Sequence, residues 1–268
     1  MKVEVSVIMG VYNPDKKQIF DSVSSVLTQT FQDFEFVICD DGSTVNTEVF
    51  SELKNSDPRI VVICNETNRG LAYSLNRCIE ESKGIYLARQ DADDISHPQR
   101  LEKQVEFLRS HPRIGFVGSN IEYFDHEVWG HYDLKEYPEK KDFLLTPPFM
   151  HASIVYRREV FSRKENLYRV AKETRRCEDY DLFMDLYSKG YRGANIQQYL
   201  YLVRENKDSL KRRKFKYRLD EVKVRMKGFR KLGISHVYDI FIIKPVIVGL
   251  IPKQLLEKIK DLFYKRLR

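Results

Sequence analysis

Short apolar segments alternate with stretches of helical periodicity in the first 110 residues, and this alternation restricts the chain to few folds. The apolar segments are residues 3–9, 34–39, 60–64 and 85–88. Between them, apolar residues recur every three or four positions, as at Ile19, Val23 and Val26, which is typical of an amphipathic helix. Strands that alternate with helices predict an α/β fold with a mostly parallel central sheet flanked by helices.

Polar loops follow three of the four predicted strands, at residues 10–13, 40–43 and 91–94. In sheets of this kind, ligands bind outside the carboxyl ends of the strands. We therefore expect these three loops to meet at one edge of the sheet and to form the functional site.

The third loop, Asp91-Ala92-Asp93-Asp94, places three carboxylates within four residues at the end of an apolar strand. Such charges repel one another unless a cation lies among them. Oxygen ligands from a short Asp-x-Asp suit Mg²⁺ or Mn²⁺, which normally take substrate phosphates as further ligands. The alternative is a solvated turn that caps the next helix.

The second part of the chain changes character after Ile114. Shorter strands are predicted at 115–119, 121–124 and 152–156, and a helix opens at Cys177-Glu178. No linker-like stretch interrupts residues 1–203, which we predict to be one catalytic domain. Its first half, 1–113, is of the nucleotide-binding type, its second half, 114–203, is of the acceptor type, and 204–268 form a basic helical extension.

Charge divides the chain unevenly. Residues 204–268 carry 20 Lys and Arg against 7 Asp and Glu, which leaves residues 1–203 with a net charge of −6 in a chain of +7. A basic segment of this kind is expected to bind a polyanion such as membrane phospholipid or nucleic acid. No nucleic-acid-binding motif accompanies the charge, so we expect no nucleic-acid partner.

The extension combines this charge with apolar helical faces. One predicted face comprises Leu219, Val222, Met226, Phe229 and Leu232, and residues 253–268 have leucines on one side and basic residues opposite. The latter pattern is typical of a helix in an anionic membrane interface. The alternatives are packing on the catalytic domain or on another subunit of a homo-oligomer. Because residues 1–10 lack signal-peptide architecture, we expect a cytoplasmic protein at the inner face of the plasma membrane.

Five motifs, in this order and spacing, resemble glycosyltransferase family 2. They are SVIMGVYN at 6–13, DDGS at 40–43, NRGLAYSLN at 68–76, DADD at 91–94 with Pro98 and Arg100 after it, and EDYDL at 178–182. The resemblance covers about residues 3–205. It implies the GT-A fold, with a Rossmann-like central sheet, and inverting transfer of a sugar from a nucleotide-sugar donor.

The resemblance also implies roles for single residues on the donor side. The donor-binding residues would be Gly10, Tyr12, Asn13, Asp40, Asn68, Arg69, Asp91 and Arg204. Tyr12 would pack on the nucleobase and Asp40 would accept a hydrogen bond from a uracil-type N3–H. Taken alone, Tyr12 is equally an aromatic anchor of a turn, and Asp40 is equally a turn cap.

By the same resemblance, Asp93 would bind the divalent metal, Mn²⁺ or Mg²⁺, that bridges the diphosphate. Asp91 would face the ribose or a metal-bound water, and Asp94 would serve only as a cap. Asp179 would be the catalytic base, with Glu178 in reserve, because inversion needs a carboxylate that removes the proton of the acceptor hydroxyl. Acidic residues in the first turn of a helix are also common for dipole reasons alone.

Two further residues complete the expected site. His151 occupies an acceptor-side position, although a lone histidine is more often structural. Many relatives carry a histidine where this chain has Arg204. A guanidinium does not ligate a metal but clamps phosphate oxygens, so the stringency of the metal requirement stays open.

The predicted function is transfer of a sugar from a nucleotide diphosphate sugar, a UDP-sugar by preference. The acceptor would be a saccharide or a polyprenyl-diphosphate-linked glycan in bacterial surface polysaccharide synthesis. One alternative is a sugar nucleotidylyltransferase, which would need a glycine-rich loop with a basic residue near the N-terminus, and residues 10–14 lack both. Another is a non-catalytic glycan-binding relative.

Overall fold

A nine-stranded mixed sheet forms the centre of the protein. The computed structural model describes residues 3–205 and 215–250. The strands lie in the order β3-β2-β1-β4-β8-β6-β9-β5, with β7 paired to β6, and β1 to β4 are parallel. Their bounds are β1 Val5–Val11, β2 Phe34–Asp40, β3 Ile60–Cys64, β4 Tyr86–Arg89, β5 Ile95–Ser96, β6 Phe116–Phe124, β7 Val128–Tyr132, β8 Val155–Arg157 and β9 Gly193–Arg204.

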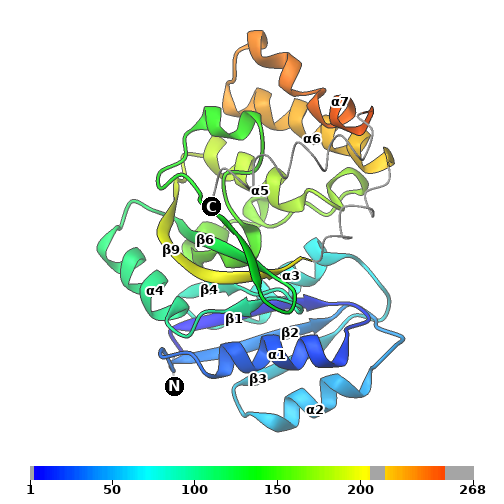
Figure 1. Ribbon diagram of the computed structural model, residues 1–268, viewed down its shortest axis with the longest axis vertical. Helices are drawn as coiled ribbons and strands as arrows, with labels where there is room; N and C mark the ends of the chain where they lie inside the picture. Colours follow the sequence, from blue (N-terminus) through cyan, green and yellow to red (C-terminus); the bar gives the residue numbers. More distant parts are fainter. Residues whose placement is uncertain (1–2, 206–214, 251–268) are drawn as a thin grey trace.

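Helices cover both faces of this sheet (Figure 1). The α-helices are α1 Lys16–Leu27, α2 Glu48–Ser56, α3 Leu71–Glu81, α4 Arg100–Ser110, α5 Glu178–Ser188, α6 Phe215–Leu232 and α7 Lys244–Leu250. Side chains of α1, α2 and α4 share one apolar core with the sheet, and those of α3, α5 and α6 share the other. Short 3₁₀ turns connect the later elements, namely η1 Lys140–Leu144, η2 His151–Ser153, η3 Arg158–Phe161, η4 Lys164–Asn166, η5 Lys172–Thr174 and η7 His236–Phe241.

The α/β prediction is confirmed, and the first four strands lie within two residues of their predicted bounds. Every residue of β2 and β4 is buried. Parallel strands covered by helices on both faces have such continuous apolar runs. This burial is why four short segments were sufficient to locate half of the sheet.

The structure departs from the prediction in three places. The strands expected at 115–119 and 121–124 are one strand, β6, because β9 runs beside its whole length with shifts of register near Asn120. The strand expected at 152–156 begins instead with the 3₁₀ turn η2, and only Val155–Arg157 pair in the sheet. Strands β5, β7 and β9 and helix α2 were not predicted.

The apolar face predicted for the first helix of the extension was right for Phe229 and Leu232, which are buried, and wrong for Leu219 and Met226. Helix α6 buries Val224, Phe229 and Leu232, whereas Leu219 and Met226 are 47% and 52% exposed. The helix is turned by its packing on α5, where a Cβ at Gly228 would lie 2.3 Å from Met184 Sδ.

The buried Arg225 also fixes α6 to the rest of the fold. Its guanidinium donates to the carbonyl oxygens of Leu144 and Leu145, at 2.9 and 3.0 Å. Helix α6 thus packs into the core of the preceding elements. The predicted domain boundary at residue 203 remains a proposal that rests on charge and composition.

The amphipathic segment at 253–268 lies outside the described residues. Within 3–205 and 215–250, none of the helices is both long and apolar enough to cross a bilayer.

Candidate active site

The carboxyl ends of β1, β2 and β4 lie at the same edge of the sheet. The last residues of β1 and β2, Val11 and Asp40, are opposite each other, whereas β4 ends three residues earlier, with Arg89 opposite Ile8. The loops that follow these strands are the three polar loops expected from the sequence. Because parallel strands end at a common edge, loops about 80 residues apart in sequence start from the same edge.

Asn13 ties the first loop to the second. Its backbone N–H donates to Ser43 Oγ at 2.9 Å, and its Oδ1 accepts from the N–H of Thr44 at 2.8 Å. Asn13 adopts a positive φ of 49°, which asparagine tolerates better than most residues. Tyr12 beside it is 49% exposed, so its ring is available for stacking on a ligand.

Asp40 lies at the end of β2 and is 9% exposed. Its Oδ1 accepts from the N–H of Ser43 at 2.8 Å, which is the turn-capping contact considered as an alternative. A carboxylate has further lone pairs, so this contact and the proposed base recognition are compatible.

Asp41, the neighbour of Asp40, is a residue that the sequence reasoning missed. Its two carboxylate oxygens accept from the backbone N–H groups of Arg69 and Gly70, each at 2.8 Å, and Oδ1 also accepts from Asn65 Nδ2 at 2.7 Å. Asp41 therefore holds the loop that enters α3. Two features of the sequence indicate this role. Asp41 is the second acid of the DDGS motif, and a loop that leads into a helix follows in the NRGLAYSLN motif.

Gly10 lies in β1 directly beneath α3. A Cβ at this position would lie 3.0 Å from Leu71 Cδ1 and 3.2 Å from Ser74 Cβ. Its absence lets α3 approach the strand, so the structure gives Gly10 a packing role beside the proposed donor contact. Asn68 and Arg69 are exposed at the start of the same helix.

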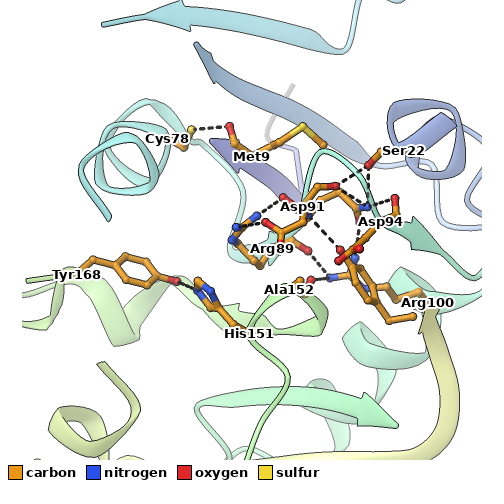
Figure 2. Close-up of polar contacts among 12 residues, drawn as sticks. Met9, Ser22, Cys78, Arg89, Asp91, Asp94, Arg100, His151, Ala152 and Tyr168 are labelled. Atoms are coloured by element: carbon orange, nitrogen blue, oxygen red, sulfur yellow. Dashed lines mark hydrogen bonds and ion pairs between the residues drawn. The ribbon is translucent and has the colours of Figure 1, made fainter. Parts of the chain in front are cut away.

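The acid loop begins with an ion pair on a buried arginine. Arg89 is fully buried and donates to Asp91 Oδ1 and to the carbonyl oxygen of Gln90 (Figure 2). Its Nε has no hydrogen-bond partner among the described residues. Arg89 was not predicted, because its apolar context gives no sign of a charge partner two residues away.

Asp94 is a correction, because it is not a helix cap. Helix α4 begins at Arg100 with Gln99 as its N-cap residue, so the acid loop ends well before it. Asp94 is 4% exposed, and its Oδ1 accepts from the backbone N–H of Arg204 at 2.8 Å. Burial, followed by the charges of Asp91 and Asp93, raises the pKa of Asp94 well above its usual range.

A second buried arginine supports the acid loop from below. Arg100 donates to Gln90 Oε1 at 2.9 Å and to Ser96 Oγ at 2.8 Å. Ser22 of α1 donates to the carbonyl oxygen of Asp91 at 2.7 Å. These contacts fix the loop backbone and leave the carboxylates of Asp91 and Asp93 at its surface.

Asp93 is the exposed carboxylate of the loop. Partial burial, followed by the charge of Asp91, raises its pKa. Arg204 lies beside it, with Nε donating to the carbonyl oxygen of Asp93 at 2.8 Å. The structure thus places Arg204 at the acid loop, as expected from the sequence.

The carboxylates of the acid loop fit a divalent metal ion whose remaining ligands come from a bound substrate. Among the described residues, no group of three or more His, Cys, Asp or Glu could hold a metal by itself. Asp91 and Asp93 form an acid pair whose mutual repulsion a cation would relieve. Mg²⁺ commonly binds one or two carboxylates together with substrate phosphates.

Glu178 and Asp179 form the first turn of α5. Burial, followed by the charge of Asp179, raises the pKa of Glu178 to about 8; the charge of Arg89 lowers it by a smaller amount and that of Asp91 raises it slightly. At neutral pH Glu178 is therefore mostly protonated, whereas a general base must be a carboxylate.

We expect Glu178 to make the stability of the protein depend on pH. Since its folded-state pKa is raised, ionisation disfavours the folded state as pH rises from about 4.5 to about 8. The free energy of unfolding should fall by a few kcal/mol across that window, and Glu178→Gln should remove most of the fall. Urea denaturation of both proteins between pH 5 and 9 measures this. Equal pH dependence in the two would contradict the assignment.

His151, the predicted acceptor-side residue, lies in η2 and pairs with a tyrosine. Its Nε2 is 2.7 Å from the hydroxyl oxygen of Tyr168 (Figure 2). Burial, assisted by the positive charge of Arg89, holds the pKa of His151 well below its usual range. The imidazole is therefore neutral near pH 7. Like Asp41 and Arg89, Tyr168 was not predicted from the sequence.

Comparison with known proteins defines the family. Residues 6–164 match the family model described as glycosyl transferase family 2. The chain is 38% identical over 258 residues to EpsE of Bacillus subtilis, named as a glycosyltransferase, with 95% of this chain and 92% of EpsE covered. The chain belongs to glycosyl transferase family 2 and is a glycosyltransferase.

A second relative carries a more specific name. The chain is 38% identical over 118 residues to WfgD of Escherichia coli, a UDP-Glc:alpha-D-GlcNAc-diphosphoundecaprenol beta-1,3-glucosyltransferase. This match covers 44% of this chain and 46% of WfgD.

Two solved structures share the GT-A fold. TarS of S. aureus, residues 1–349 in complex with UDP-GlcNAc, has a TM-score of 0.71 at 17% identity, over 90% of this chain and 70% of TarS. The mannosyltransferase PcManGT of Pyrobaculum calidifontis, in complex with GDP-Man and Mn²⁺, has a TM-score of 0.63 at 17% identity. That match covers 100% of this chain and 83% of PcManGT.

Proposed function

We propose that this chain is an inverting, metal-dependent glycosyltransferase that uses a UDP-sugar and extends a glycan on a polyprenyl-diphosphate lipid. The observation that carries the proposal is the acid loop after β4, where the buried Arg89 pairs with Asp91 and Asp93 stays exposed. This acid pair suits a diphosphate with its metal, and the acidic first turn of α5, with Glu178 and Asp179, offers a base.

The residues and the two substrates would have the following roles in the reaction. Asp179 takes the proton of an acceptor hydroxyl while that oxygen forms a bond to C1 of the donor sugar. The bond from C1 to the diphosphate oxygen breaks, and the nucleoside diphosphate leaves with the electron pair. Attack from the face opposite the leaving group inverts the anomeric centre.

On the donor side, Tyr12 would stack on the base, and Asp40 would accept from a uracil N3–H. Asn68 and Arg69 would lie near the phosphates, and Arg204 would clamp a phosphate oxygen. Asp93, with Asp91, would hold Mn²⁺ or Mg²⁺, which when bound neutralises charge on the diphosphate. A solved structure of the same fold, PcManGT, contains Mn²⁺ with its nucleotide sugar, which supports this choice.

The lipid-linked acceptor is supported by the name of WfgD and by the charge of the C-terminal extension. Residues 204–268 carry a net charge of +13. Within the described part, the apolar side chains of Val237, Ile240 and Leu250 are 77%, 58% and 72% exposed. Basic and exposed apolar groups together suit an anionic membrane surface, where a polyprenyl-linked acceptor resides. We therefore propose that the enzyme acts at the cytoplasmic face of the plasma membrane.

A thermal-shift panel of UDP-, GDP- and dTDP-sugars with Mn²⁺ tests the donor. A ligand that binds the folded state raises its apparent stability, by about 2.7 kcal/mol at 100 times Kd. We expect a UDP-sugar to raise Tm most, and EDTA to abolish the shift. A larger shift with GDP- or dTDP-sugars would overturn the UDP assignment.

Transfer should then be measured to a synthetic GlcNAc-diphospholipid in vesicles of anionic or zwitterionic phospholipid. Faster transfer in the anionic vesicles, lost at high salt, is the expected result. Equal rates would contradict the membrane contact without affecting the donor assignment. Donor binding without turnover on any acceptor would favour the non-catalytic alternative. Release of pyrophosphate from a sugar phosphate and a nucleoside triphosphate would favour the nucleotidylyltransferase.

A further inference from the structure

Asn76, the last residue of the NRGLAYSLN motif, makes hydrogen bonds that have no part in the proposed reaction. It lies on α3. Its Nδ2 donates to the carbonyl oxygen of Tyr168 at 2.8 Å, and its Oδ1 accepts from the N–H of Tyr168 at 2.9 Å. One amide side chain thus satisfies both backbone groups of a residue 92 positions away. Tyr168 lies between the short turns η4 and η5, where no strand or helix supplies such partners.

The side chain of Tyr168 points from this anchored backbone towards His151 (Figure 2). The ring is 2% exposed, and its hydroxyl makes the 2.7 Å contact with His151 Nε2. Burial raises the pKa of Tyr168, so the hydroxyl stays protonated. Since His151 is neutral, the pair is joined by one ordinary hydrogen bond, and Nδ1 is the ring nitrogen left to meet another group.

The Tyr168 and His151 pair packs against helix α5, where the ring of His151 is 6.2 Å from that of Phe183 and Tyr168 shares a core with Cys177 and Tyr180. On its other side, the backbone N–H of Arg89 donates to the carbonyl oxygen of Ile154, directly after η2, at 2.8 Å. The charges of Arg89, Asp179 and Glu178 accordingly influence the pKa of Tyr168. At its other end, α3 begins at the loop held by Asp41. One helix therefore connects the donor-side loop with the residues beside the base.

We propose that Asn76 and Tyr168 are positioning residues for the acceptor side of the site. Asn76 fixes the backbone of Tyr168, and the Tyr168 hydroxyl fixes the ring of His151, so that Nδ1 faces an acceptor hydroxyl. The inference rests on the proposed function for the identity of the acceptor. Holding a reacting group in one geometry is worth large factors in rate, and small displacements lose them.

Kinetics with separate donor and acceptor titrations test the proposal. UDP release from UDP-glucose and from UDP-GlcNAc would be followed with Mn²⁺ and a synthetic GlcNAc-diphospholipid. Tyr168→Phe removes only the hydroxyl, and Asn76→Leu removes both backbone contacts. We expect each to lower kcat/KM for the acceptor about tenfold, the effect of one hydrogen bond, with the donor KM within about twofold. The double variant should lose no more than the stronger single variant, because both act through His151.

Asn166→Ala supplies the matched control. Asn166 is buried, and its Nδ2 donates to the carbonyl oxygen of Val160 at 2.6 Å in a neighbouring turn. It should destabilise the fold in a similar way but leave the acceptor kinetics of the folded protein unchanged. An equal loss in Asn166→Ala, or additive losses in the double variant, would reduce Asn76 and Tyr168 to a general structural role and overturn the proposal.

Histidine NMR separates this proposal from the proposed function. The ring ¹⁵N signals of His151, assigned by their loss in His151→Gln, report its tautomer and protonation without any turnover. Tyr168→Phe and Asn76→Leu should each shift these signals, even if the wild type transfers no sugar to the chosen lipid. Unchanged signals in both variants would overturn the positioning role whatever the enzyme activity shows.

Discussion

Asp93→Asn is expected to reduce transfer about 10³-fold while leaving the protein at least as stable as the wild type. Loss of a metal ligand forfeits several kcal/mol of charge stabilisation in the transition state. The fold does not depend on this charge, because the pKa of Asp93 is raised in the folded state, so its ionisation costs stability at neutral pH. UDP release with Mn²⁺ and urea denaturation at pH 7 measure the two effects.

Asp91→Asn should behave differently, although it changes a carboxylate two residues away. It leaves the buried Arg89 without its ion partner, which should cost on the order of 2 kcal/mol, less than for a fully buried pair since Asp91 is 36% exposed. Asp33→Asn, an exposed acid before β2 at the opposite end of that strand, should change neither quantity. Full activity in Asp93→Asn would refute its role as metal ligand.

Asp179→Asn is expected to lower kcat by about 10² to 10⁴, the usual range for loss of a general base. Asparagine keeps the shape and an oxygen that can accept the 2.7 Å contact from the Tyr180 N–H, but it does not take up a proton. Glu178→Gln should cost much less, because the amide resembles the protonated carboxyl that Glu178 has at neutral pH. Single-turnover rates with the GlcNAc-diphospholipid acceptor compare the two variants.

Asp181→Asn is the matched control on the same turn of α5. Asp181 forms a two-pronged pair with Arg169, with both contacts at 2.9 Å. Its loss should reduce stability but leave the rate per folded molecule near the wild-type value. If Glu178→Gln is the inactive variant and Asp179→Asn retains most activity, the base is Glu178.

The N-terminal half of the fold could be predicted because its information is local. Strands β1 to β4 are mostly apolar segments, and the helices between them show their buried faces in the spacing of residues such as Ile19 and Val23. Strand β9 could not be predicted in this way. Its middle, Gln197 to Tyr199, is exposed, and it is a strand because β6 and β5 pair with it on either side.

Helix α6 shows the same division. Its helical periodicity was visible, and Phe229 and Leu232 were correctly expected on the buried face, but the position of the rest of that face was not, because Leu219 and Met226 are as apolar as the residues that are buried. The face was selected by the shape of α5, where Gly228 fits against Met184, and by the carbonyl groups that accept from Arg225.

At the site, the sequence alone determined which loops meet at the carboxyl edge of the sheet. Polar residues after buried strands are costly unless they serve a ligand, and parallel strands end at a common edge. Those two rules apply to any chain with this pattern. They were sufficient to predict that Asp40, Asp91 and Asp93 lie at that edge.

Only the tertiary structure decided which of those groups interact and in what state of charge. The buried Arg89 donates to the carboxylate of Asp91, and Asp41 accepts from the backbone N–H of Gly70 at the start of α3. Asn76 accepts from the backbone N–H of Tyr168, 92 residues later in the chain. The raised pKa of Glu178 likewise depends on burial and on neighbours from other segments. Contacts and desolvation of this kind arise from three-dimensional proximity, so the order of residues along the chain contains no local sign of them.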